Sequence, residues 1–339
     1  MIFSLVLLGC QDYNLQGPNT VETSYNPPDL AVATREDAIT QVTVPSVDVL
    51  FVIDNSGSMM EEQTNLRQNF DDFMRYFTDS GLDYHVGVVS TDMDDRNQSG
   101  KLIDDGSGTR YIDASSSAED AVSSFRQRAK LGTTGSSTER GTDAAYAALV
   151  THAADVNKGF FRDDGVLSVV VISDEVNQSR NPSWQEFAAW MVAVKPEDDQ
   201  TWFSSIVGPA PNGCTNGTNI AERGTGYLEV TDQVGGITYS ICEDDYSSIL
   251  EELGMQAAGL KREFFLSDVP VVDTIKVSVD TDGDVREFGT DEWTYDGVRN
   301  SITFVSFVPD PLAVVNIDYL PLADSHDPAA VTDTADTGG

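Results

Sequence analysis

Short oxygen-bearing side chains occupy alternate positions directly after an apolar segment that ends at residue 53. They are Asp54, Ser56 and Ser58, and Gly57 between them permits a tight loop. Three oxygens at this spacing can converge on one point, and hard carboxylate and hydroxyl oxygens suit Mg²⁺ better than a soft metal. The segment therefore predicts part of a magnesium site, which Mn²⁺ or Ca²⁺ could also occupy.

Two further segments offer oxygen ligands. Ser173, Asp174 and Glu175 follow the most apolar run of the chain, 167–173, and supply a second carboxylate. The hydroxyl-rich stretch 135–141 precedes an expected helix and offers a hydroxyl from a third loop. A site built from these segments requires that the fold bring three separate loops together.

The elements that must position these loops alternate between strands and helices. Apolar strands are expected at 47–53, 84–90, 167–173 and 202–207, and helices at 62–77, 118–130, 142–155, 183–195 and 246–259. The alternation predicts right-handed βαβ units and a doubly wound, mostly parallel α/β sheet. Ligands of such a sheet bind outside the carboxyl ends of its strands, and the loops with Asp54 and Asp174 leave expected strands at those ends.

From about residue 47 to 259 the chain resembles a von Willebrand factor A domain with a metal-ion-dependent adhesion site. The resemblance rests on the D-x-S-x-S motif after a buried strand, although the third loop reads Ser-Asp-Glu where the family commonly has Thr-Asp-Gly. It implies a Rossmann-like fold for residues 46–260. It also implies a set of five metal ligands: Asp54, Ser56, Ser58, Thr138 and Asp174. Ser137 is an alternative to Thr138 in this set. The resemblance also implies that the ion captures an Asp or Glu carboxylate of a protein ligand.

After residue 260 the pattern changes to short alternating strands, at 271–279, 292–295, 301–305 and 313–319, with Asp-Gly turns between some of them. This predicts a small all-β, sandwich-like domain over 261–321, followed by a disordered acidic tail over 322–339. Asp280, Asp282 and Asp284 lack the spacing of an EF-hand loop, so a hairpin turn is favoured over a calcium site.

The beginning of the chain resembles the signal peptide of a bacterial lipoprotein. An apolar run at 2–8, too short to span a bilayer, precedes Cys10, which would become the lipidated residue. Residues 1–10 would then be the signal peptide with its lipobox, and the polar segment 11–45 a flexible tether. We expect a protein of the cell envelope that contacts the membrane through this lipid anchor only. Gln11, in place of an Asp, favours the outer membrane.

The other two cysteines are Cys214 and Cys242. Export into an oxidising compartment favours a disulfide between them.

Composition and missing motifs exclude several functions. The 339 residues contain 20 Lys and Arg against 56 Asp and Glu, a net charge of −36, which would repel a nucleic acid. A serine hydrolase would need a Gly-x-Ser-x-Gly elbow and a suitably placed His, and an aspartyl phosphatase would need a second Asp where Ser56 stands. We therefore expect a binding protein and no catalytic residues. A structural or spacer lipoprotein without metal, and less readily a hydrolase, are the alternatives.

Overall fold

A computed structural model describes residues 34–322, except residues 43, 45, 78–81, 197–199 and 218. The expected signal peptide with Cys10, the first part of the expected tether and the tail from residue 323 lie outside the described residues. Within the described segments, no helix has the length and apolar character needed to cross a membrane.

A six-stranded sheet forms the centre of the larger domain, in the order β4-β3-β2-β5-β6-β9. All neighbouring strands are parallel except the short β4, which pairs antiparallel with β3. The bounds are β2 Ser46–Ile53, β3 Asp83–Ser90, β4 Ile112–Asp113, β5 Val166–Ser173, β6 Thr201–Val207 and β9 Thr238–Ser240. The prediction of a mostly parallel sheet is confirmed.

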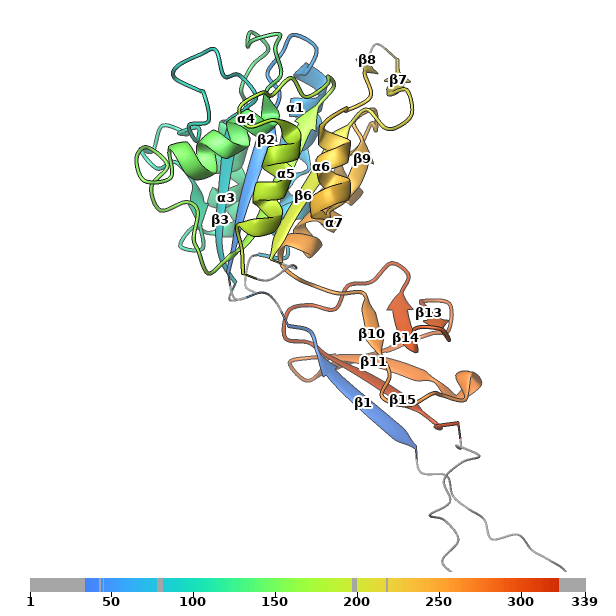
Figure 1. Ribbon diagram of the computed structural model, residues 1–339. Helices are drawn as coiled ribbons and strands as arrows, with labels where there is room; N and C mark the ends of the chain where they lie inside the picture. Colours follow the sequence, from blue (N-terminus) through green and yellow to red (C-terminus); the bar gives the residue numbers. More distant parts are fainter. Residues whose placement is uncertain are drawn as a thin grey trace, which may run out of the picture.

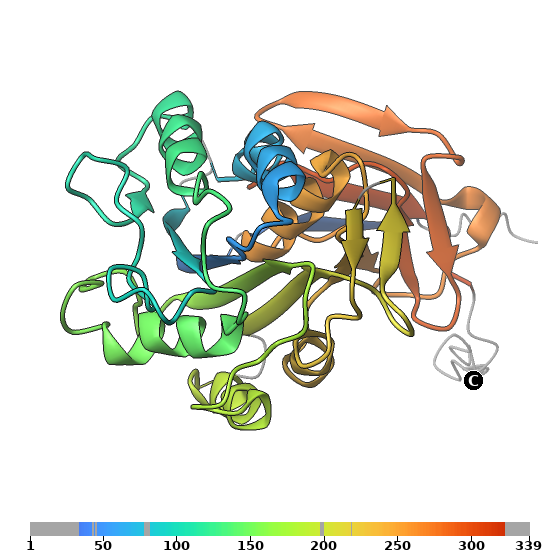
Figure 2. The same cartoon turned by 90° about the horizontal axis from the view of Figure 1, so that it is seen from above.

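Helices cover both faces of this sheet (Figures 1 and 2). Phe51 of β2 packs into the core formed with α1 Met60–Gln68, α2 Phe70–Met74, α3 Ala118–Arg128 and α7 Ser247–Ala257. Leu50 and Val52 point to the opposite core, formed with α4 Gly141–Tyr146, the π-helical turn Ala147–Thr151, α5 Trp184–Ala193 and α6 Tyr227–Val234. Alternate residues of one buried strand thus serve two helix layers, as a doubly wound sheet requires.

Two expected helices differ in detail. The segment 62–77 forms two helices, α1 and α2, separated at Asn69. The segment 142–155 forms α4 and the π-helical turn, and the helical structure ends at Thr151. The apolar faces are nevertheless where the sequence places them, because Leu66, Phe70 and Phe73 are all fully buried.

The smaller domain consists of two antiparallel sheets around one apolar core. One sheet has the order β1-β15-β11-β12 and the other β10-β14-β13. Their bounds are β1 Arg35–Thr40, β10 Glu263–Phe265, β11 Lys276–Thr281, β12 Asp284–Phe288, β13 Trp293–Asp296, β14 Ser301–Phe304 and β15 Val314–Tyr319. A 3₁₀ turn, Val272–Thr274, precedes β11, so the expected strand at 271–279 begins later and ends later.

Strand β1 corrects the predicted domain organisation. Residues 35–40 were expected to be part of a tether over 11–45, but they pair with β15 along its whole length, from Arg35↔Tyr319 to Thr40↔Val314. The prediction failed because β1 is an edge strand with no buried residue, so its sequence carries no apolar pattern. The α/β domain is therefore inserted between the first and second strands of the β domain.

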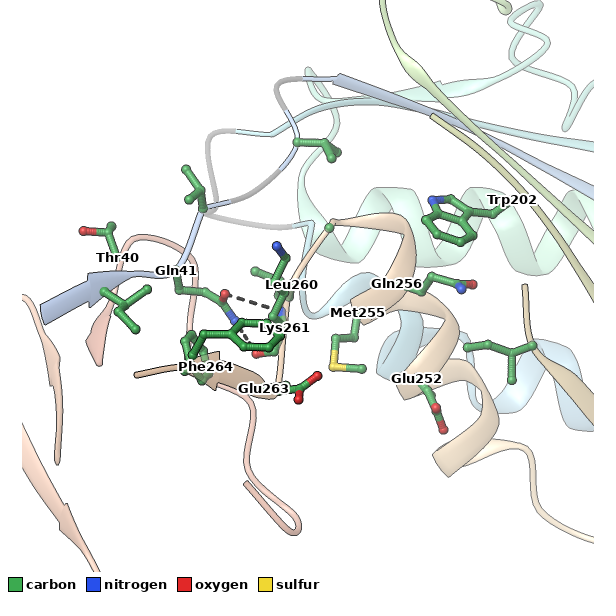
Figure 3. Close-up of a pocket in the computed structure, with 16 residues that line it drawn as sticks. Thr40, Gln41, Trp202, Glu252, Met255, Gln256, Leu260, Lys261, Glu263 and Phe264 are labelled. Carbon is green, nitrogen blue, oxygen red and sulfur yellow. Dashed lines mark hydrogen bonds between the residues drawn. The ribbon is translucent and has the colours of Figure 1, made fainter. Parts of the chain in front are cut away.

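Two chain segments connect the domains and run side by side (Figure 1). Val44 N–H donates to Ala258 O at 3.1 Å, and Gln41 Nε2 donates to Lys261 O at 2.8 Å. Beside these segments lies a mostly apolar cavity of about 880 Å³, whose lining includes Trp202 and Met255 (Figure 3). It opens near the amino end of β6, whereas the loops with Asp54 and Asp174 leave the carboxyl ends of β2 and β5.

Candidate functional site

Asp54 directly follows β2, whose carboxyl end lies on the side of the sheet away from the β domain (Figure 1), and its side chain is fully buried. The backbone N–H of Ser56 donates to Asp54 Oδ1 at 2.7 Å, and Ser173 Oγ donates to Oδ2 at 2.7 Å. Gln63 Nε2 donates to the Asp54 carbonyl at 2.9 Å. The carboxylate and its backbone are therefore held in a fixed orientation by residues from three elements.

The structure brings Ser56, Ser58 and Asp174 to the same place. The two serine hydroxyls lie 3.3 Å apart, and the Ser58 hydroxyl is near enough to the Asp174 carboxyl group to lower its pKa. Asp174 is 6% exposed, and its Oδ1 is buried without a hydrogen-bond partner among the described residues. Buried carboxylate oxygens normally have a partner, so this one is free to bind a ligand or ion.

The two aspartates are under electrostatic strain. Burial raises the pKa of Asp54, and the nearby negative charge of Asp174 raises it further, against hydrogen bonds from Ser56 and Ser173 that lower it. Burial also raises the pKa of Asp174, as does the charge of Glu222. Two desolvated carboxylates at one point are costly unless a cation offsets them.

Thr138 lies in the loop before α4, and its backbone N–H donates to Ser136 Oγ at 3.1 Å. Its side chain is half-buried, and Ser137, the alternative, is exposed. The charge of Asp54 acts on the next residue of this loop, Glu139, and raises its pKa. Sequence reasoning missed Glu139, although an acid beside the hydroxyl-rich stretch was a visible signal.

Glu139 is fully buried. Thr91 Oγ1 donates to Glu139 Oε2, whereas Oε1 has no hydrogen-bond partner in the described part of the chain. Burial, together with the charge of Asp54, raises the pKa of Glu139 to about 9. The edge of the sheet therefore contains a third carboxyl group that the surrounding protein does not neutralise.

The donor set suits a hard cation. Asp54, Ser56, Ser58 and Asp174 offer only oxygens, and one of them is the partnerless Asp174 Oδ1. Across the described ranges, no three His, Cys, Asp or Glu side chains converge as metal ligands, so Glu139 does not join the two aspartates at direct coordination distance.

A hairpin stands beside the site. It consists of β7 Cys214–Asn216 and β8 Asn219–Ala221. The predicted disulfide between Cys214 and Cys242 is confirmed, and the Cα atoms of the two cysteines lie 6.2 Å apart. The N–H of Glu222, directly after β8, donates to the Asp174 carbonyl at 2.8 Å. The hairpin is thus fixed to the loop that carries Asp174.

Comparisons with known proteins give distant structural likeness. No protein family and no curated protein matches the chain. A von Willebrand factor type A structure from Catenulispora acidiphila superposes with a TM-score of 0.41 at 10% identity, over 86% of this chain and 62% of that one. The open pilus adhesin SpaC of Lactobacillus rhamnosus GG gives 0.41 at 10%, over 84% and 40%. An aerotolerance-related membrane protein of Bacteroides fragilis NCTC 9343 gives 0.34 at 13%, over 63% and 100%. The chain thus spans less than two thirds of the first two structures.

Proposed function

We propose that this protein binds a protein ligand through a divalent cation held at the carboxyl edge of its parallel sheet. One observation carries the proposal. Two loops from neighbouring strands, β2 and β5, bring Asp54, Ser56, Ser58 and Asp174 together, and Asp174 Oδ1 is buried there without a partner. We propose that the site binds its ligand and does not catalyse a reaction on it.

The cation would be Mg²⁺, with Mn²⁺ or Ca²⁺ as alternatives, since all donors are hard oxygens. When bound, it supplies a positive centre on which a carboxylate of the ligand can replace water. Such a centre lets an acidic protein bind another acidic surface, because the ion reverses the local charge. The ligand group would be an Asp or Glu side chain.

The residues of the chain have separate tasks in this proposal. Asp54 and Asp174 provide the charge that retains the ion. Ser56 orients Asp54 with its N–H and offers its hydroxyl oxygen to the ion. Ser58, whose hydroxyl lies 3.3 Å from that of Ser56, offers a second hydroxyl oxygen and lowers the pKa of Asp174. Ser173 holds the far oxygen of Asp54, which keeps the carboxylate from rotating.

Isothermal titration calorimetry with Mg²⁺ and Mn²⁺ on the chelator-stripped full chain tests the site. We expect Asp54→Ala to weaken metal binding at least a hundredfold, because it removes a charged ligand from a buried site. Asp104→Asn, which neutralises an exposed acid on another loop, should bind metal as the parent does. Equal affinity of Asp54→Ala and the parent would refute the proposal.

Ligand capture has a matching test. Parent and Asp54→Ala proteins are incubated with envelope extract, with Mg²⁺ or with EDTA, and the retained proteins are compared. We expect a ligand that is retained only by the parent and only without EDTA. A ligand retained equally in all four samples would show that capture does not use the ion.

A further inference from the structure

Glu139 is held at the candidate site by its backbone and by one of its two carboxyl oxygens. The N–H of Gln178 donates to the Glu139 carbonyl at 2.7 Å, and the N–H of Arg140 donates to Thr91 O at 3.3 Å. Thr91, at the end of β3, also donates its hydroxyl to Glu139 Oε2. These contacts hold Glu139 between the residue that follows β3 and the loop that follows β5.

The other oxygen of Glu139 has nothing to bind in the described structure. Oε1 is buried and unpartnered. Thr91, whose hydroxyl donates to Oε2, also donates its N–H to the carbonyl of Ile53, the residue before Asp54, at 3.2 Å. A buried carboxyl group in this position repels the Asp54 carboxylate when both are ionised, and burial has removed the water that would solvate the charges. A cation next to Asp54 would remove both penalties.

We propose that Glu139, in the place expected for Thr138, is the residue of the third loop that retains the cation. This inference rests on the proposed function. The described carboxylates do not converge as three direct ligands, so Glu139 acts from outside the ion's own ligands, as the acceptor for its water shell and as an additional negative charge. Partners of this kind typically contribute ten- to a hundredfold to metal affinity.

A purely structural role for Glu139 gives different expectations. If Glu139 only held Thr91 and the loop before α4, replacing it would destabilise the metal-free protein and leave metal affinity nearly unchanged. If it retains the cation, replacing it by Gln removes a repulsion from the metal-free protein and a favourable charge from the metal-bound one. The two roles therefore predict opposite effects on the metal-free protein.

The test measures Mg²⁺ and Ca²⁺ affinity by calorimetry and thermal unfolding in EDTA, both on the full chain. We expect Glu139→Gln to weaken binding ten- to a hundredfold while its melting temperature in EDTA equals or exceeds that of the parent. Thr138→Val should stay within about threefold of the parent in affinity, as should Glu175→Gln, which removes a half-buried carboxylate from the same edge.

Three results would overturn the inference: Glu139→Gln within about threefold of the parent in affinity, Thr138→Val as impaired as Glu139→Gln, or Glu175→Gln as impaired as Glu139→Gln. Asp54→Ala separates this failure from failure of the proposed function. If Asp54→Ala loses the metal and Glu139→Gln does not, only the role of Glu139 is wrong. If Asp54→Ala binds as the parent does, the site itself is wrong.

Discussion

The guanidinium group of Arg128 lies in the interior of a very acidic protein. It is 1% exposed, and it donates hydrogen bonds to the carbonyls of Ile103 and Thr109 and to the hydroxyl of Ser124. Its charge is balanced by Asp105, whose Oδ2 lies 3.2 Å from Arg128 Nη2. Removing one partner of such a pair leaves the other charge buried and unpaired.

Asp105 makes stability depend on pH. Partial burial raises its pKa, but hydrogen bonds from Ser107 and Ser124 and the charge of Arg128 lower it to about 2, from a usual value of 3.8. A lowered pKa in the folded state adds stability above pH 3.8, and this stability is lost as the pH falls toward 2.

We predict that Asp105→Asn lowers the free energy of unfolding at pH 7 by about 1–2 kcal/mol, after allowance for partial solvation. The difference from the parent should shrink between pH 4 and pH 2, measured by urea unfolding. Asp71→Asn breaks an exposed pair with Arg126 and should change little at either pH. A difference that does not vary with pH would contradict this account.

At the residue scale, the candidate site was predictable only where the sequence has a motif. Asp54, Ser56, Ser58 and Asp174 follow apolar strands directly, so the topology of the sheet places them together. Glu139 follows no strand, and the conformation of the loop before α4 decides that its side chain is buried. Loop conformation of this kind depends on tertiary contacts, such as Gln178 N–H to Glu139 O, that no local pattern encodes.

At the scale of elements, the β7–β8 hairpin is held to the loops around the sheet by a disulfide and by hydrogen bonds. A Cβ atom on Gly208, directly after β6, would lie 1.9 Å from the Glu222 carbonyl oxygen, so only glycine fits where the hairpin closes. Asn216 Nδ2 donates to the Cys242 carbonyl at 3.0 Å, beside the disulfide. The hairpin is therefore fixed to the sheet at its base and along β7.

We predict that replacing both Cys214 and Cys242 by Ser lowers the free energy of unfolding by about 3–4 kcal/mol, the chain-entropy estimate for a loop of this size. The comparison is made in a Cys10→Ser background, so that no third thiol can exchange. The reduced parent should match the double variant, and dithiothreitol should not affect that variant. Equal unfolding midpoints of the oxidised parent and the double variant would contradict the prediction.

Strands with an apolar pattern in their own residues could be predicted from the sequence, whereas a strand without such a pattern could not. β2, β5 and β6 are nearly continuous apolar runs, and the prediction placed them within one or two residues of their observed bounds. β1, with the sequence Arg-Glu-Asp-Ala-Ile-Thr, has no fully buried residue, and it pairs with β15. A strand that forms only by pairing with a partner far away in the sequence cannot be predicted from its own residues.

At the scale of the whole molecule, Gln41 joins the two segments that connect the domains. It is 2% exposed, its Nε2 donates to Lys261 O at 2.8 Å and Pro309 O at 3.4 Å, and its Oε1 accepts from Lys261 N–H at 3.4 Å. One side chain therefore links the end of β1 to the segment that leaves α7.

We predict that Gln41→Ala destabilises the protein by about 1–3 kcal/mol, because it leaves buried backbone groups without partners. Hydrogen–deuterium exchange should become faster at Lys261, whose N–H loses its acceptor, while exchange in β2 and β5 is unchanged. Thr40→Ala, at the exposed neighbouring position, is the control. Unchanged exchange at Lys261 would show that Gln41 does not hold the two segments together.

The inserted position of the α/β domain also sets an order of events during synthesis. Tyr319 Oη donates to Asp37 Oδ2 across 282 positions, so β1 emerges from the ribosome long before its partner β15 exists. The α/β domain is complete earlier, and its two ends meet where Val44 N–H bonds Ala258 O. Once it has folded, it brings β1 close to the later strands, which shortens the loop that their pairing must close. β1 is thus synthesised before the other described strands, yet it is among the last to pair with its partner.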